Sequence, residues 1–217
     1  MMNAETKERS LIRKLGVPML SGAVVGFLGA FGIVQLMKSG VLGQLDGSRE
    51  IAILVALVYT ISATAVMIGV VSPGFGARFL NVEDADELRE QKAMLGYSAI
   101  SMLALGLALA CVALAAPVGP IPTMAAIVVL AALLALAWFT SRRQSQYMDE
   151  LMSDLSRGSV SAAFYFLLLG GGLWAVLSHL EFVTGPNPLD WLSMFAAALL
   201  IGTFWVCGKR GLLVRRK

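Results

Sequence analysis

Six long apolar segments without Asp, Glu, Lys or Arg constrain the fold of this chain more than any other feature. They are residues 15–37, 51–72, 96–116, 123–141, 158–180 and 191–208, and each contains between 18 and 23 residues. An α-helix needs about 20 apolar residues to cross the ~30 Å hydrocarbon core of a bilayer. The sequence therefore predicts an all-α, polytopic transmembrane helical bundle with six spans, both of whose termini are cytoplasmic.

The composition excludes the competing fold classes. Charged residues make up 14% of the chain and the mean hydropathy is +0.78, whereas a soluble domain has about 25% charged residues. The apolar segments do not alternate in polarity, as transmembrane β-strands would. Three prolines and a glycine in residues 117–122 interrupt one long apolar run, because proline cannot continue a helix. We therefore place a turn between the third and fourth spans.

The basic residues indicate the orientation of the chain in the membrane. If the N-terminus is cytoplasmic, 15 of the 17 Lys and Arg residues lie on the cytoplasmic side, and only Lys38 and Arg49 lie on the other. This asymmetry is typical of helical membrane proteins. We expect an N-terminal cytoplasmic segment (1–14), a six-helix membrane domain (15–208) and a basic cytoplasmic tail (209–217). The expected location is a bacterial inner (plasma) membrane, and the run 15–37 is too long for the core of a signal peptide.

Two groups of small or polar residues within the spans are candidates for a polar pathway. One is a set of hydroxyls in the second span, and the other is a glycine triplet in the fifth. They are Tyr59, Thr60, Ser62, Thr64, Gly170, Gly171 and Gly172. Glycines weaken a helix and can line a cavity in a transporter. The alternative is structural, since hydroxyls can bond to carbonyls of their own helix and glycines admit a neighbouring helix.

A stripe of small residues in the first span indicates close helix packing. Gly22, Gly26 and Ala30 recur at intervals of four residues, and small residues let two helices approach closely in lipid. The partner is either another span of the same chain or a second copy of it.

The linkers 77–95 and 142–157 are candidates for partner docking. Each contains an Asp-Glu-Leu triplet followed ten residues after its leucine by Ser-Ala. The candidate docking residues are Asp86, Glu87, Leu88, Asp149, Glu150 and Leu151. The recurrence indicates either a duplicated unit or a coincidence between two amphipathic linkers.

No catalytic motif, cofactor-binding motif or metal-ligand cluster is present in the sequence. The spans contain no ionisable residue except His179 at the outer end of the fifth, although such residues are the usual functional sites of membrane proteins. We expect no cofactor, and no nucleic-acid partner, because membrane orientation accounts for the basic residues. The expected partners are the lipid bilayer and either a second copy of the chain or another membrane protein.

Three functions follow from these observations. The favoured one is an accessory or scaffold subunit that docks partners through its cytoplasmic linkers. The alternative is a small transporter or permease with a pathway near the hydroxyls of the second span and the glycine triplet. The third is an intramembrane enzyme that modifies lipids.

Overall fold

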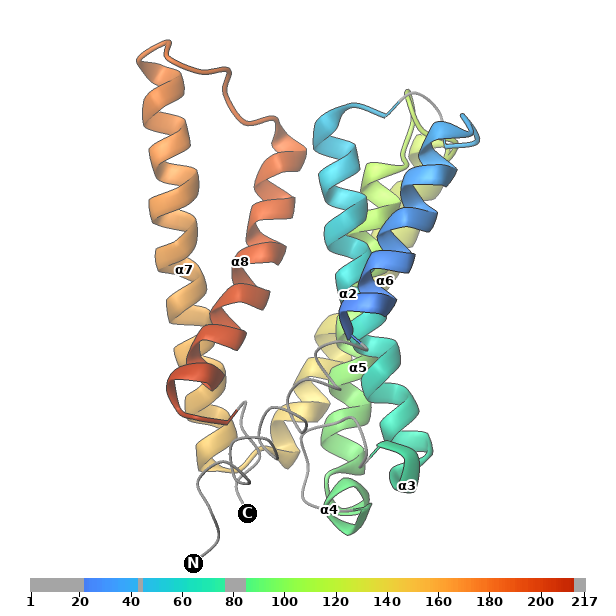
Figure 1. The fold of residues 1–217 in the computed structure, drawn as a ribbon, viewed down its shortest axis with the longest axis vertical. Coiled ribbons are helices and arrows are strands. Elements are labelled where there is room, and N and C mark those ends of the chain that lie inside the picture. Colours follow the sequence, from blue (N-terminus) through green and yellow to red (C-terminus); the bar gives the residue numbers. More distant parts are fainter. Residues whose placement is uncertain (1–21, 43–44, 77–84, 213–217) are drawn as a thin grey trace, which may run out of the picture.

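The computed structural model describes residues 22–42, 45–76 and 85–212, and the secondary structure in these ranges consists of helices without strands (Figure 1). Five helices are long and apolar enough to cross a membrane: α2 (Gly47–Val71), α5 (Lys92–Ala113), α6 (Thr123–Gln144), α7 (Glu150–His179) and α8 (Pro188–Lys209). The predicted all-helical membrane architecture is thus confirmed for the last five apolar segments.

The remaining helices are short. They are the apolar helix Gly22–Lys38, α3 (Pro73–Gly76), α4 (Ala85–Glu90) and the 3₁₀ turn η1 (Ser145–Tyr147). Helix Gly22–Lys38 covers most of the predicted first span, of which residues 15–21 lie outside the described part. Residues 1–14, 77–84 and 213–217 also lie outside it, so the predicted N-terminal segment and parts of the first linker and the tail are not described.

Helices α2 and α7 begin before their apolar segments, at residues that follow a capping aspartate. The Asp46 carboxylate caps α2 by accepting the backbone N–H of Arg49, and Asp149 caps α7 in the same way. A side-chain oxygen at this position satisfies an N–H that has no partner within the helix. Residues 150–157 of the second linker are consequently the first turns of α7.

The helices form two groups that stand side by side (Figure 1). Helices α2, α5 and α6 form one group, in which α5 packs against both of the others. The hairpin of α7 and α8 forms the second group, and it joins the first through contacts of α8 with α2 and α5. Helix α7 therefore packs mainly against α8 and leaves much of its surface uncovered.

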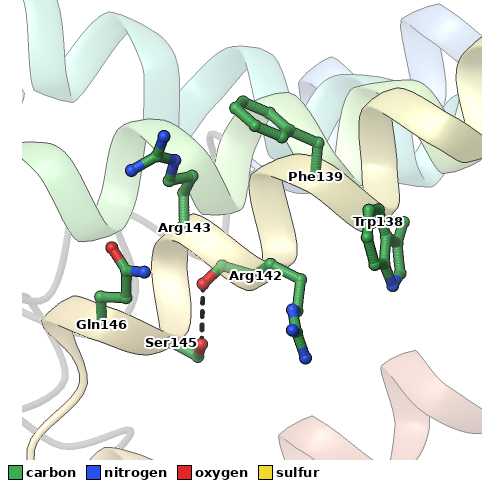
Figure 2. A pocket seen from close by; sticks show the side chains of 6 residues that line it. All are labelled: Trp138, Phe139, Arg142, Arg143, Ser145 and Gln146. Atoms are coloured by element: carbon green, nitrogen blue, oxygen red, sulfur yellow. Dashed lines mark hydrogen bonds between the residues drawn. The ribbon is translucent and has the colours of Figure 1, made fainter.

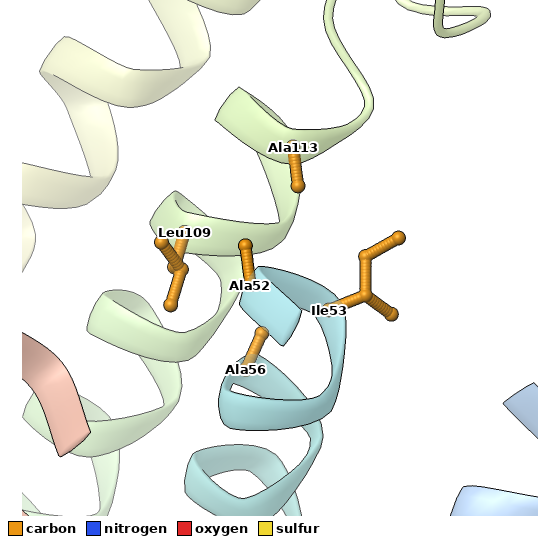
Figure 3. Packing of buried hydrophobic residues seen from close by; sticks show 5 residues of the cluster. All are labelled: Ala52, Ile53, Ala56, Leu109 and Ala113. Carbon is orange, nitrogen blue, oxygen red and sulfur yellow. The ribbon is translucent and has the colours of Figure 1, made fainter. Parts of the chain in front are cut away.

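Small residues allow the helices to approach closely. The central cluster consists of Ala52, Ile53 and Ala56 of α2 with Leu109 and Ala113 of α5 (Figure 3). In lipid the hydrophobic effect does not drive helices together, so association relies on close packing and on hydrogen bonds between helices. The three alanines of this cluster have small side chains, which let the backbones of α2 and α5 come close together.

Two glycines mark the closest helix crossings. A Cβ atom on Gly106 of α5 would lie 2.9 Å from the Cβ of Tyr59 in α2. A Cβ atom on Gly202 of α8 would lie 2.6 Å from the backbone oxygen of Ser159 in α7. Since Cβ atoms do not approach other atoms this closely, only glycine permits these two crossings.

Candidate functional site

A cavity of about 520 Å³ separates the two groups of helices. Its walls come from α2, α5, α7 and α8, at the end of the bundle where the linkers 77–95 and 142–157 lie. Seven side-chain hydroxyls line it, on four helices: Tyr59, Ser62, Ser98, Ser101, Ser156, Ser159 and Thr203. Its other lining residues are mainly Met, Leu and Val, and none is Asp, Glu, Lys, Arg or His. The cavity is therefore uncharged but carries several groups that can form hydrogen bonds.

An apolar groove of about 330 Å³ adjoins this cavity. It follows α5 between α6 and α8, and both hollows share Tyr59, Leu105 and Leu199 as lining residues. Apart from Tyr59, the groove is lined by Leu, Ala, Val and Phe side chains. The polar cavity and the apolar groove thus meet at Tyr59.

Tyr59 connects the two groups of helices. Its side chain is buried at 3% exposure, and its hydroxyl donates a hydrogen bond to the backbone oxygen of Ala196 in α8, at 3.0 Å. A buried phenol needs such a partner, because an unpaired hydroxyl in an apolar environment is costly. Tyr59 therefore fixes the distance between α2 and α8 at the boundary of the cavity.

The structure separates the four predicted hydroxyls of α2 into two pairs. Tyr59 and Ser62 line the cavity. Thr60 instead donates to the backbone oxygen of Ala56 at 2.9 Å, and Thr64 donates to that of Thr60 at 2.7 Å. Neither threonine lines either hollow. The two threonines satisfy backbone acceptors of their own helix, which is the common role of hydroxyls inside helices.

The glycine triplet lies away from both hollows. Helix α7 is continuous through all three glycines. Gly171 is buried against Trp191, whose Cζ3 would lie 2.9 Å from a Cβ atom on this glycine, whereas the space beside Gly170 is open. A Cβ atom on Gly172 would approach only Leu168 of the same helix. The described residues do not bring the triplet and the α2 hydroxyls to one cavity.

The first candidate docking triplet is partly internal to the fold. Leu88 has 0% exposure and lies against Gly76, so it anchors α4 to the end of α2 and α3. Asp86 is exposed and forms an ion pair with Arg89. The side chain of Glu87 lies outside the described residues.

The second triplet is at the surface. The Asp149 carboxylate caps α7 by accepting the backbone N–H of Met152, while Glu150 and Leu151 are exposed. Leu151 is 46% exposed, in contrast to the corresponding Leu88. The two copies of the recurring triplet therefore differ in local structure, since α4 and α5 are separated at Gln91 and α7 is continuous.

The predicted small-residue stripe of helix Gly22–Lys38 is mostly open. Cβ atoms added to Gly22 or Gly26 would meet nothing within 4 Å, and Ala30 is half-buried. Contact with α2 is made instead by Gly29, next to Leu57 and Ile61. The face at Gly22 and Gly26 is therefore not used for packing against the described part of this chain.

Sequence reasoning missed five of the seven cavity hydroxyls, namely Ser98, Ser101, Ser156, Ser159 and Thr203. Helices α5 and α7 each contribute two of these five hydroxyls and α8 contributes one, and nothing in the sequence distinguishes them from the other hydroxyls of the same helices. The sequence did contain one sign of a shared cavity, because these hydroxyls all lie toward the ends of their helices that adjoin the linkers. It becomes meaningful only when the packing of the helices is known.

Asp190 has a structural role at the start of α8. The Asp190 carboxylate accepts the backbone N–H of Asn187 at 2.7 Å and completes the N-terminal cap of α8. Within residues 22–42, 45–76 and 85–212, no three His, Cys, Asp or Glu side chains come together as metal ligands would.

The five long apolar helices are compatible with a multi-pass helical membrane protein. Comparison with known protein families, curated protein sequences and solved structures finds no match to the chain. The function must therefore be argued from the geometry.

Proposed function

We propose that this chain is an accessory or scaffold subunit of a bacterial inner membrane, with six spans and both termini in the cytoplasm. The first span is the segment 15–37, which includes most of helix Gly22–Lys38, and the other five spans are the long apolar helices. The distribution of 15 basic residues on one side against two on the other supports the orientation.

Reporter fusions test this topology. Fusions after Gly43 and Gly119 should report a location outside the cytoplasm, and fusions after Gln91 and Gln146 a cytoplasmic one. A single reversed reporter would contradict the six-span arrangement.

The observation that carries the accessory role is a tyrosine on the uncovered face of α7. Tyr165 is 59% exposed, within the apolar segment 158–180, and the structure gives its hydroxyl no hydrogen-bond partner among the described residues. Its neighbours Phe164 and Leu168 are exposed as well. Hydrocarbon offers no partner to a hydroxyl, so hydroxyls in spans commonly bond across helices. A helix of a second copy or of another membrane protein supplies the missing acceptor.

This role is tested by the size of the complex in a mild detergent, measured by native mass spectrometry. The wild-type chain should be recovered with a stoichiometric partner, and Tyr165→Phe should weaken the complex about 3- to 30-fold, as expected for one hydrogen bond between helices worth about 0.6–2 kcal/mol. Tyr147→Phe is the matched control, because Tyr147 is also exposed but lies in the linker. A monomeric wild-type chain, or equal effects of both variants, would contradict the proposal.

The cavity favours a second function, that of a small permease for neutral polar solutes. Its hydroxyls can replace part of the hydration of such a solute, and it contains no charge that would bind an ion. Uptake of labelled neutral solutes into proteoliposomes tests this function. Ser62→Phe should block uptake because Ser62 lines the cavity, whereas Thr64→Phe should not because Thr64 is exposed elsewhere on α2. Absence of uptake by the wild-type chain would reject the permease.

A further inference from the structure

The linker end of α6 carries two arginines, each with an aromatic residue one helix turn before it (Figure 2). The Cζ of Arg142 lies 5.6 Å from the ring centre of Trp138, and that of Arg143 lies 5.3 Å from the ring centre of Phe139. The four side chains, with Ser145 and Gln146, line an open cavity of about 310 Å³. Stacking on a ring holds a guanidinium in place while its N–H groups remain free to bind another group.

The position along α6 places this cavity at the membrane surface. With a rise of 1.5 Å per residue, Trp138 lies about 22 Å and Arg142 about 28 Å along the helix from Thr123. The hydrocarbon core is about 30 Å thick. With Thr123 placed at one edge of the hydrocarbon, Arg142 lies next to the headgroups of the opposite leaflet, and the two rings lie one to two helix turns deeper, beside the acyl chains.

The two arginines carry unneutralised positive charge. The ion pairs formed within the described residues are Arg89 with Asp86 and Arg210 with Asp154, and neither includes Arg142 or Arg143. The Ser145 hydroxyl donates to the backbone oxygen of Arg142 at 2.8 Å, so this carbonyl at the helix end has a partner. The cavity consequently combines two free cations with an apolar floor, since Trp138 is 66% and Phe139 50% exposed.

We propose that Arg142 and Arg143, which point to different sides of α6 (Figure 2), bind the phosphates of anionic phospholipids whose acyl chains lie along Trp138 and Phe139. Guanidinium groups bind phosphate oxygens through pairs of parallel hydrogen bonds. A free phosphate ion would use the two arginines but leave both rings uncovered. The combination of rings and cations therefore selects a lipid, and its depth matches the headgroup of the cytoplasmic leaflet. This inference rests on the proposed topology, which the reporter fusions test separately, but not on the accessory role.

The test is native mass spectrometry of the full chain in detergent, titrated with phosphatidylglycerol, phosphatidylcholine or inorganic phosphate. The wild-type chain should retain phosphatidylglycerol in preference to phosphatidylcholine. Arg142→Gln/Arg143→Gln should weaken this binding about 30-fold, because each basic residue near an anionic headgroup contributes about five-fold. The matched control is Arg157→Gln/Lys209→Gln, which removes two exposed basic residues from the same end of the bundle.

Further variants separate the lipid from a free anion. Trp138→Ala/Phe139→Ala should weaken phosphatidylglycerol binding and leave both arginines in place. Inorganic phosphate should not displace the lipid. Circular dichroism of each variant verifies that the helices remain folded. Equal loss in the control variant, equal retention of the two lipids by the wild-type chain, or displacement by inorganic phosphate would each overturn the proposal.

Discussion

Arg49 is the residue whose removal should most clearly show how α2 and α5 are held together at the end of the bundle where α5 ends. From the first turn of α2, its guanidinium Nη1 donates to the backbone oxygens of Ala113 at 2.7 Å and Ala115 at 2.8 Å. The Ala113 oxygen would normally accept the N–H of residue 117, but that residue is Pro117 and has none. Arg49 therefore supplies the donor that the proline lacks.

The cost of removing this donor follows from the geometry. Ala113 has 0% exposure, so water does not readily replace the guanidinium at its carbonyl. A buried acceptor left without a partner costs about 1–3 kcal/mol. The Ala115 oxygen also accepts the N–H of Gly119 at 3.2 Å, so it retains a partner. We therefore expect Arg49→Ala to destabilise the chain by about 2 kcal/mol, which includes loss of a positive charge at the C-terminal end of α5.

Thermal unfolding in one detergent, followed by circular dichroism, measures this effect. A loss of about 2 kcal/mol should lower Tm by about 4–8 °C in a chain of this size. Arg49→Lys should recover part of the loss, because it keeps the charge on a shorter side chain. Lys38→Ala is the matched control, since Lys38 is exposed and is the only other basic residue predicted on that side of the membrane. A Tm of Arg49→Ala within 1 °C of wild type, or an equal decrease with Lys38→Ala, would refute the reasoning.

Four further variants test the packing. Leu88→Ala should cost about 2–5 kcal/mol because it empties a fully buried site, whereas Leu151→Ala should change stability by less than about 0.5 kcal/mol; chemical denaturation compares the two. Gly202→Val should separate α7 from α8, because a Cβ atom would lie 2.6 Å from the Ser159 oxygen, and cysteine crosslinking across this hairpin should then fail. Ser101→Ala removes a hydroxyl that donates to the Ala137 oxygen and accepts from the Thr140 hydroxyl of α6, and it should cost about 0.6–1.2 kcal/mol, seen as a small decrease in Tm.

The candidate site was only partly predictable, because sequence spacing identifies a residue's helix but not its neighbour. Tyr59 and Ser62 were recognised as polar groups in a span, and both line the cavity. Thr60 and Thr64 have the same composition signal, yet they bond within α2. Whether a hydroxyl of α2 lines the cavity depends on which side of α2 faces α5 and α8. A helix that is apolar on all sides has no hydrophobic periodicity that would predict this side from the sequence.

The two leucines of the recurring triplet show the same limit. Leu88 and Leu151 occupy equivalent positions in the recurring triplet, but the side chain of Leu88 is fully buried, whereas Leu151 is exposed. A break at Gln91 turns α4 back onto α3 and α2, while the Asp149 cap starts an unbroken α7. Local sequence similarity could not reveal this, because the burial of Leu88 depends on the small residue Gly76 in a different helix.

The sequence by itself determined the class of the protein and the approximate position of its membrane helices. This was possible because the energetic cost of placing charges in hydrocarbon and the ~30 Å thickness of the bilayer act on each segment independently of the others. Tertiary structure alone decided that Arg49 completes α5, that serines of separate helices line one cavity, and that α7 packs mainly on α8. These features depend on close contacts between small residues such as Gly106 and Gly202, and contacts between helices are not encoded in the hydropathy of any one of them.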